Sequence, residues 1–174
     1  MTEKNDELEG EITLEAAIEL VAAVATGDLT LAQIEETTAE ELYAMADVGY
    51  DQMEMGELEN ARIIFAGLTA SNPFDAYFHA LLASACQRQA DYPAAALHYR
   101  RAIDLEPDDA YSLVNLGEVL LHLFQLRLDE GDCIAAGSLF GEAETTLARA
   151  AVVQGFEAMP AANRARHLQG ALPR

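Results

Sequence analysis

Two segments of this chain, 34 residues apart, end in the same way. FAGLTASNPFD at residues 65–75 and YRRAIDLEPDD at residues 99–109 each start with an aromatic residue and reach Pro and, two residues later, Asp. Proline cannot continue a helix, so each ending predicts the turn into a following helical segment. The interval therefore predicts a helical unit that repeats every 34 residues.

Other positions agree with this register. Two small residues, one aromatic residue and one proline of the first unit each recur 34 residues later: Gly49 and Ala83, Ala61 and Ala95, Phe65 and Tyr99, and Pro73 and Pro107. This spacing is typical of tetratricopeptide repeats, which are helix–turn–helix units of that length. The sequence predicts an all-α fold, a tetratricopeptide-repeat solenoid of three helix–turn–helix units with N-terminal capping helices and a short C-terminal helix.

The third unit contains an addition. It begins at Ala110 and has Leu116-Gly117 in phase, but the interval from this small residue to the next alanine is 19 residues, against 12 in the first two units. Apolar residues keep helical spacing through LLHLFQLRL, and seven residues are close to two helical turns. We expect the first helix of this unit to run about 20 residues, roughly 10 Å longer than its counterparts. The alternative is a loop inserted between ordinary helices.

The periodicity also predicts boundaries. We expect an acidic flexible N-terminus at 1–10, capping or dimerisation helices at 11–39, three tetratricopeptide repeats at 40–155, and a tail with a short helix at 156–174. The expected helices cover about 11–25, 29–37, 40–54, 58–70, 75–88, 92–105, 109–129 and 133–154, followed by a weak helix after Pro160. Gly56 and Ala90 mark the inner turns of the first two units.

Charge and composition exclude several kinds of partner. The chain of 174 residues has a net charge of −20, with twelve acidic residues and one lysine among the first 41. Such a surface repels phosphate backbones and anionic lipid, so we expect no nucleic-acid and no membrane partner. The charge also keeps a protein, and anything that it carries, in solution; the alternative is that it is only a solvated acidic surface. The polar, acidic start does not resemble a secretory signal, and no apolar run is long enough to cross a bilayer, so we expect a soluble, cytoplasmic protein.

The residues that would carry chemistry are scattered. The four histidines show no HExxH pattern, and there is no Gly-rich phosphate loop and no GxSxG motif. We expect no metal, no cofactor and no catalysis. Cys86 and Cys133 form no CxxC pair, and we expect both to be small buried apolar residues.

Residues one period apart should lie on equivalent faces of the solenoid. Tyr43, Tyr77 and Tyr111 share one such position, and three further positions follow beside them. The predicted peptide-binding groove consists of Tyr43, Ala46, Tyr50, Met53, Tyr77, Ala80, Ser84, Tyr111 and Val114. These residues avoid the hairpin-packing stripe of Met45, Val48 and Gly49. Tyrosine offers a bound peptide an apolar face and a polar tip, although half-buried packing is the alternative role.

The groove so predicted contains no basic residue, which excludes a clamp for acidic C-termini of the heat-shock co-chaperone kind.

The segment from Glu41 to Asp109 starts with ELYAMA and contains the second repeat, DAYFHALLASACQRQADYPAAALHYRRAIDLEPDD. On these two features it resembles the class II chaperones of bacterial type III secretion, the low-calcium-response family. The similarity covers about residues 12–150. The seven added residues and an arginine-bearing tail depart from that family's pattern.

The resemblance implies a function. Members of that family have three tetratricopeptide units, bind hydrophobic translocator proteins in the bacterial cytoplasm before secretion, and hold a proline-flanked segment in the concave groove. Carried over by position, the family's groove tyrosines correspond to Tyr43 and Tyr50. The family often dimerises through its N-terminal region, so we expect a homodimer formed through residues 11–25, with capping of the first repeat as the alternative. The alternative function is a tetratricopeptide adaptor for protein–protein interaction in another assembly.

Overall fold

The computed structural model describes residues 23, 26–27 and 29–153, and these form helices without any strand. The predicted helices at 11–25 and after Pro160, and the predicted tails at 1–10 and 156–174, lie wholly or mostly outside the described residues. The helices are α2 (Leu31–Ile34), α3 (Ala39–Glu54), α4 (Leu58–Ser71), α5 (Ala76–Arg88), α6 (Tyr92–Leu105), α7 (Ala110–Asp129) and α8 (Cys133–Val152). No helix in this part of the chain is both long enough and apolar enough to cross a membrane.

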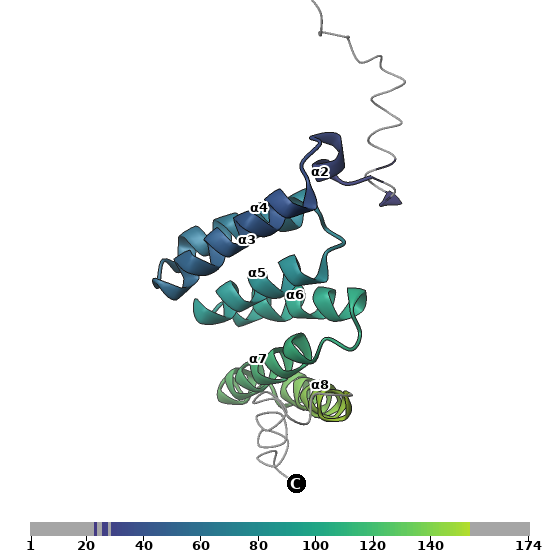
Figure 1. Cartoon of the computed structure of the whole chain (residues 1–174). Helices are drawn as coiled ribbons and strands as arrows, with labels where there is room; N and C mark the ends of the chain where they lie inside the picture. Colours follow the sequence, from purple (N-terminus) through teal and green to yellow (C-terminus); the bar gives the residue numbers. More distant parts are fainter. Residues whose placement is uncertain (1–22, 24–25, 28, 154–174) are drawn as a thin grey trace, which may run out of the picture.

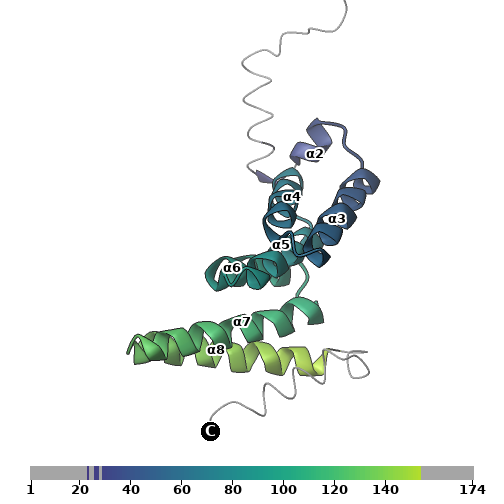
Figure 2. The ribbon, with the colours of Figure 1, turned by 90° about the vertical axis from the view of Figure 1, so that its left-hand side faces the viewer.

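The helices form three stacked hairpins, α3/α4, α5/α6 and α7/α8 (Figures 1 and 2). Consecutive hairpins meet through α4 with α5 and through α6 with α7, and the short helix α2 contacts α4. The six long helices match the predicted ranges to within two residues. The predicted all-α solenoid of three helix–turn–helix units is therefore confirmed.

Local sequence explains where the helices begin and turn. Asp75 and Asp109 precede α5 and α7, and each carboxylate accepts hydrogen bonds from the first backbone N–H groups of its helix. Each hairpin turn needs one residue with positive φ, and these are Gly56 (85°), Ala90 (61°) and Gly131 (80°). Ala90 adopts the left-handed conformation although its Cβ disfavours it, because the surrounding hairpin fixes the turn.

The core lies between the helices of each hairpin and between consecutive hairpins. Phe65 and Tyr99, the aromatic residues of the repeat, are fully buried. A Cβ on Gly49 would collide with the ring of Phe65, and one on Gly117 would collide with Leu147. The repeat therefore places small residues where a large side chain from the second helix crosses the first.

The added residues of the third unit lengthen its first helix. α7 runs 20 residues and includes residues 124–129, so the inserted-loop alternative is wrong. α8 also runs 20 residues, and the rings of Phe124 and Phe140 lie 5.4 Å apart between the two helices. In Figure 2 the α7/α8 hairpin extends past the end of α6.

The prediction of burial is wrong for the packing positions Met45 and Val48 of the first unit and for Cys133. Met45 and Val48 are 49% and 55% exposed, although they occupy packing positions of the repeat. Their equivalents in the second unit, His79 and Leu82, are buried. A whole hairpin precedes the second unit, whereas among the described residues only the short α2 precedes the first hairpin. Cys133 is exposed because it is the first residue of α8, at the hairpin turn; Cys86 is buried as predicted.

A pair of histidines joins the two helices of the second hairpin. His79 Nε2 lies 3.1 Å from the carbonyl oxygen of Pro73, and its Nδ1 lies 3.2 Å from Nδ1 of His98. A carbonyl can only accept, so Nε2 of His79 carries the proton and its Nδ1 accepts from His98. Burial lowers the pKa of both rings. At His79 the hydrogen bond to Pro73 and the charge of Asp75 oppose this shift and Arg101 adds to it; at His98 the charges of His79 and Arg62 add to it.

This pair is expected to make stability depend on pH. Because the folded pKa values are below the ordinary value of 6.5, the unfolded chain binds more protons as the pH falls below 6.5. The stabilisation is present above that pH and is lost below it. We expect the melting temperature to fall between pH 7.5 and 5 by more in the wild type than in His98→Asn, which keeps a donor but does not titrate there. Thermal melts followed by circular dichroism test this, and equal shifts in both proteins would contradict it.

Candidate functional site

Tyrosines from consecutive units lie side by side on the helices that begin each hairpin. Tyr43 on α3, Tyr77 on α5 and Tyr111 on α7 are 44%, 44% and 51% exposed. The ring centroids of Tyr43 and Tyr77 are 5.8 Å apart, and the hydroxyl of Tyr43 donates to Asp75 Oδ2 at 2.9 Å. The other oxygen of Asp75 accepts from the backbone N–H of Tyr77. The cap of α5 thus connects the tyrosines of the first two units.

The third tyrosine continues this arrangement one period later. Asp109 accepts from the backbone N–H of Tyr111 at 3.1 Å, as Asp75 does for Tyr77. The hydroxyl of Tyr111 lies 3.4 Å from Ser84 Oγ on α5. Successive units therefore present their tyrosines on one continuous surface.

A cavity of about 350 Å³ opens on this surface, and we call it the tyrosine cavity. Its lining residues are Tyr50, Met53, Tyr77, Ala80, Leu81, Ser84, Glu106, Asp109 and Tyr111. They come from α3, α5 and α7 and from the loop between α6 and α7. Six of the nine predicted groove residues line it: Tyr50, Met53, Tyr77, Ala80, Ser84 and Tyr111.

Three predicted groove residues lie elsewhere. Ala46 and Val114 are 0% and 2% exposed and belong to the core, so they have no surface to offer a ligand in this conformation. Tyr43 is exposed and contacts Tyr77, but it does not line the cavity.

Sequence reasoning missed three lining residues, Leu81, Glu106 and Asp109. Leu81 shares its repeat position with Asp47 and Asn115, so no common residue type marks that position. Asp109 did carry a signal, because it is the Asp that follows the repeated proline, and it was interpreted only as part of a helix boundary. Glu106 ends α6 and carried no signal.

The electrostatic environment of the cavity is negative. Burial and the nearby Asp47, Tyr50, Tyr111 and Asp75 raise the pKa of Tyr77. The hydrogen bond to Asp75, then burial, raises the pKa of Tyr43. Both hydroxyl groups therefore stay protonated at neutral pH, although that of Tyr43 already donates to Asp75. The surrounding carboxylates disfavour an anionic ligand.

The site is arranged for binding. Within the described part of the chain, no three His, Cys, Asp or Glu side chains come close enough to hold a metal ion. The walls of the cavity consist of apolar and aromatic groups with a few polar ones, which is typical of a site that recognises a ligand by shape and contact.

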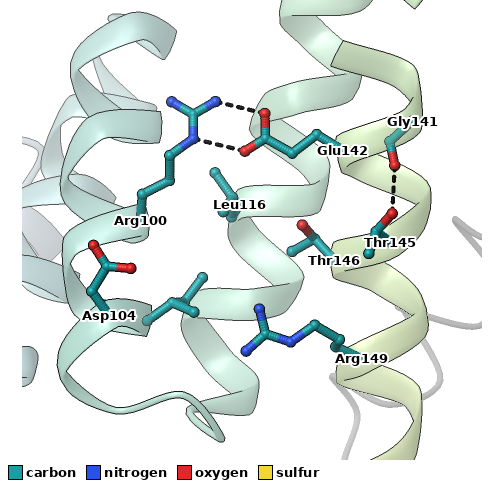
Figure 3. Close-up of a pocket in the computed structure, with 9 residues that line it drawn as sticks. Arg100, Asp104, Leu116, Gly141, Glu142, Thr145, Thr146 and Arg149 are labelled. Carbon is teal, nitrogen blue, oxygen red and sulfur yellow. Dashed lines mark hydrogen bonds and ion pairs between the residues drawn. The ribbon is translucent and has the colours of Figure 1, made fainter. Parts of the chain in front are cut away.

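A second pocket, of about 480 Å³, lies between α6, α7 and α8 (Figure 3). Arg100 donates to both carboxylate oxygens of Glu142, at 2.7 and 2.9 Å. Arg149 donates to the carbonyl oxygen of Pro107, and Thr145 donates to that of Gly141. These polar groups are therefore already bound within the chain. The contacts of Arg100 with Glu142 and of Arg149 with Pro107 join the third hairpin to the second.

Comparison with known proteins identifies the fold. No protein-family model and no curated protein sequence matches the chain. Solved structures do match, among them the first tetratricopeptide domain of Spaghetti bound to the HSP90 peptide SRMEEVD. That domain is 16% identical with a TM-score of 0.59, over 78% of this chain and 95% of that one. The chain has the tetratricopeptide-repeat fold.

Proteins of type III secretion are also among the similar structures. A type III secretion complex from Aeromonas hydrophila matches with a TM-score of 0.67 at 21% identity, over 88% of this chain and 95% of that one. The Yersinia enterocolitica chaperone SycD, in complex with a peptide of the translocator YopD, matches with a TM-score of 0.62 at 18% identity, over 79% and 95%. The tetratricopeptide fold of this chain is thus one that secretion chaperones also have.

Proposed function

We propose that this chain is a cytoplasmic chaperone of type III secretion that holds an extended segment of a hydrophobic translocator protein in the tyrosine cavity. The observation that carries the proposal is the cavity itself, whose lining includes six of the nine residues predicted from the repeat positions. Its aromatic and apolar walls suit a segment that must be kept from water until secretion. The likeness to SycD, whose structure contains a translocator peptide, supports the same kind of ligand.

The alternative role as an adaptor for acidic peptides fits the cavity poorly. The peptide bound by the Spaghetti domain, SRMEEVD, is acidic near its end. None of the nine residues that line the tyrosine cavity is basic, and two of them are carboxylates. An acidic ligand would be placed against like charge.

Co-expression tests the proposed function. The candidate client is the product of a neighbouring gene that contains long apolar segments. We expect it to stay in the soluble fraction and to co-purify with this chain, and to precipitate when it is expressed alone. The chaperone role is rejected if no product of a neighbouring gene co-purifies with this chain and each is equally soluble without it.

We further propose that the chain forms a homodimer through residues 11–25. The exposed Met45 and Val48 support this, because the same repeat positions are buried in the later units. An apolar face at the start of the stack needs a cover, and a helix from a second copy would supply it.

Truncation is expected to change the oligomeric state. A chain that starts at residue 28 should elute as a monomer, while a control that starts at residue 11 and lacks only the acidic start should elute as a dimer. Light scattering coupled to size exclusion gives the mass of each species. If the full-length chain and both truncated chains have the same oligomeric state, residues 11–25 only cap the first repeat.

A further inference from the structure

The lining of the tyrosine cavity divides by chemical type. The helices α3, α5 and α7 contribute tyrosines, Ser84 and apolar side chains, whereas the loop between α6 and α7 contributes two carboxylates, Glu106 and Asp109. A ligand in the cavity therefore meets apolar walls along the helices and negative charge beside the loop.

The two carboxylates are not equivalent. Asp109 accepts from the backbone N–H groups of Tyr111 and Ser112, so its charge is used to cap α7. The Glu106 carboxylate makes no hydrogen bond or ion pair to any residue in the described ranges, and Glu106 is exposed. Asp47 and Asp75 add further negative charge close to Tyr77. Glu106 is thus the carboxylate best able to bind a ligand.

This combination selects against a purely apolar side chain. An apolar group that covered the Glu106 carboxylate would remove its water without replacing it, which is unfavourable. Lysine and arginine match both parts of the lining, because their stems are apolar and their ends are positively charged. A positive charge over the exposed face of a tyrosine ring gains further attraction.

We propose that the tyrosine cavity takes a lysine or arginine side chain of an extended client segment, with the stem against Met53, Ala80 and Leu81 and the charge beside Glu106. This inference rests on the proposed function and narrows it: the client segment carries a basic residue beside apolar ones.

Matched peptides test the inference. The probes are fluorescein-labelled heptapeptides with proline on both sides of the centre, identical except for lysine, norleucine or glutamate at the central position. Norleucine keeps the stem of lysine and lacks its charge. We expect the lysine peptide to bind at least about fivefold more tightly than the norleucine peptide at about 50 mM salt, with a smaller ratio at about 500 mM because salt screens the charges. The glutamate peptide should bind most weakly.

Two variants assign the preference to one residue. Glu106→Gln should reduce the lysine-to-norleucine ratio to about twofold or less. Asp104→Asn is the matched control, since Asp104 is an exposed carboxylate on α6 that does not line this cavity, and it should leave the ratio unchanged. Norleucine binding as tightly as lysine, or no binding of any of the three peptides, would overturn the inference. The proposed function is judged separately, by whether the client co-purifies.

Discussion

Replacing Tyr50 and Tyr77 together by alanine is expected to weaken client binding at least about thirtyfold, because loss of an interface anchor costs about 2 kcal/mol or more. Both rings line the tyrosine cavity, and they are 48% and 44% exposed. Side chains with that much free surface contribute little to the core, so the melting temperature should change little. Isothermal titration or fluorescence anisotropy with the co-purified client measures the loss.

A control variant shows whether the loss of binding is specific to side chains that line the cavity. Leu97→Ala removes a side chain on α6 that is 63% exposed and lies outside the cavity, so it should bind the client as the wild type does. If the tyrosine double variant binds with wild-type affinity while it remains folded, the cavity is not the client site.

The fold was predictable from the sequence because its signal repeats. One helical hairpin gives a weak pattern, but a glycine or alanine, an aromatic residue and a proline that recur in register identify both the unit and its packing. The same logic predicted the long α7, since seven added residues keep the apolar stripe on the same face. What the repeat could not predict was the end of the stack, where Met45 and Val48 have packing identities but lack a preceding hairpin.

The candidate site was predictable only in part. Repeat positions show which residues line up along the stack, and they brought together the tyrosines of the cavity. They do not show how deep each position lies. Ala46, Ala80 and Val114 share one position and are all buried, and Ala80 alone lines the cavity. The carboxylates come from a loop, where helical face gives no guidance. The period relates Asp109 to Asp75, but it marks both as helix caps and does not show that Asp109 lines a cavity.

The last prediction concerns the packing of the third unit. Gly117 lies on α7 where Leu147 of α8 crosses it, and an added Cβ would lie 2.5 Å from Leu147 Cγ. Leu147 is fully buried and cannot move aside without disturbing its neighbours. Gly117→Leu should therefore lower the free energy of unfolding by roughly 3 kcal/mol, the upper part of the usual range for overpacking. That corresponds to a fall in melting temperature of about 6–12 °C for a chain of this size.

Gly67→Leu is the matched control, because it makes the same exchange in the helix α4 where nothing lies within 4 Å of the added Cβ. Leucine is a better helix former than glycine, so this variant should be slightly more stable than the wild type, by about 0.5–1 kcal/mol. Chemical denaturation followed by circular dichroism measures both variants on one scale. The two exchanges should change stability in opposite directions, because helix propensity favours leucine at both sites and only Gly117 has a neighbour in the way. A Gly117→Leu protein as stable as Gly67→Leu would mean that α7 and α8 do not cross as closely at Gly117 as described.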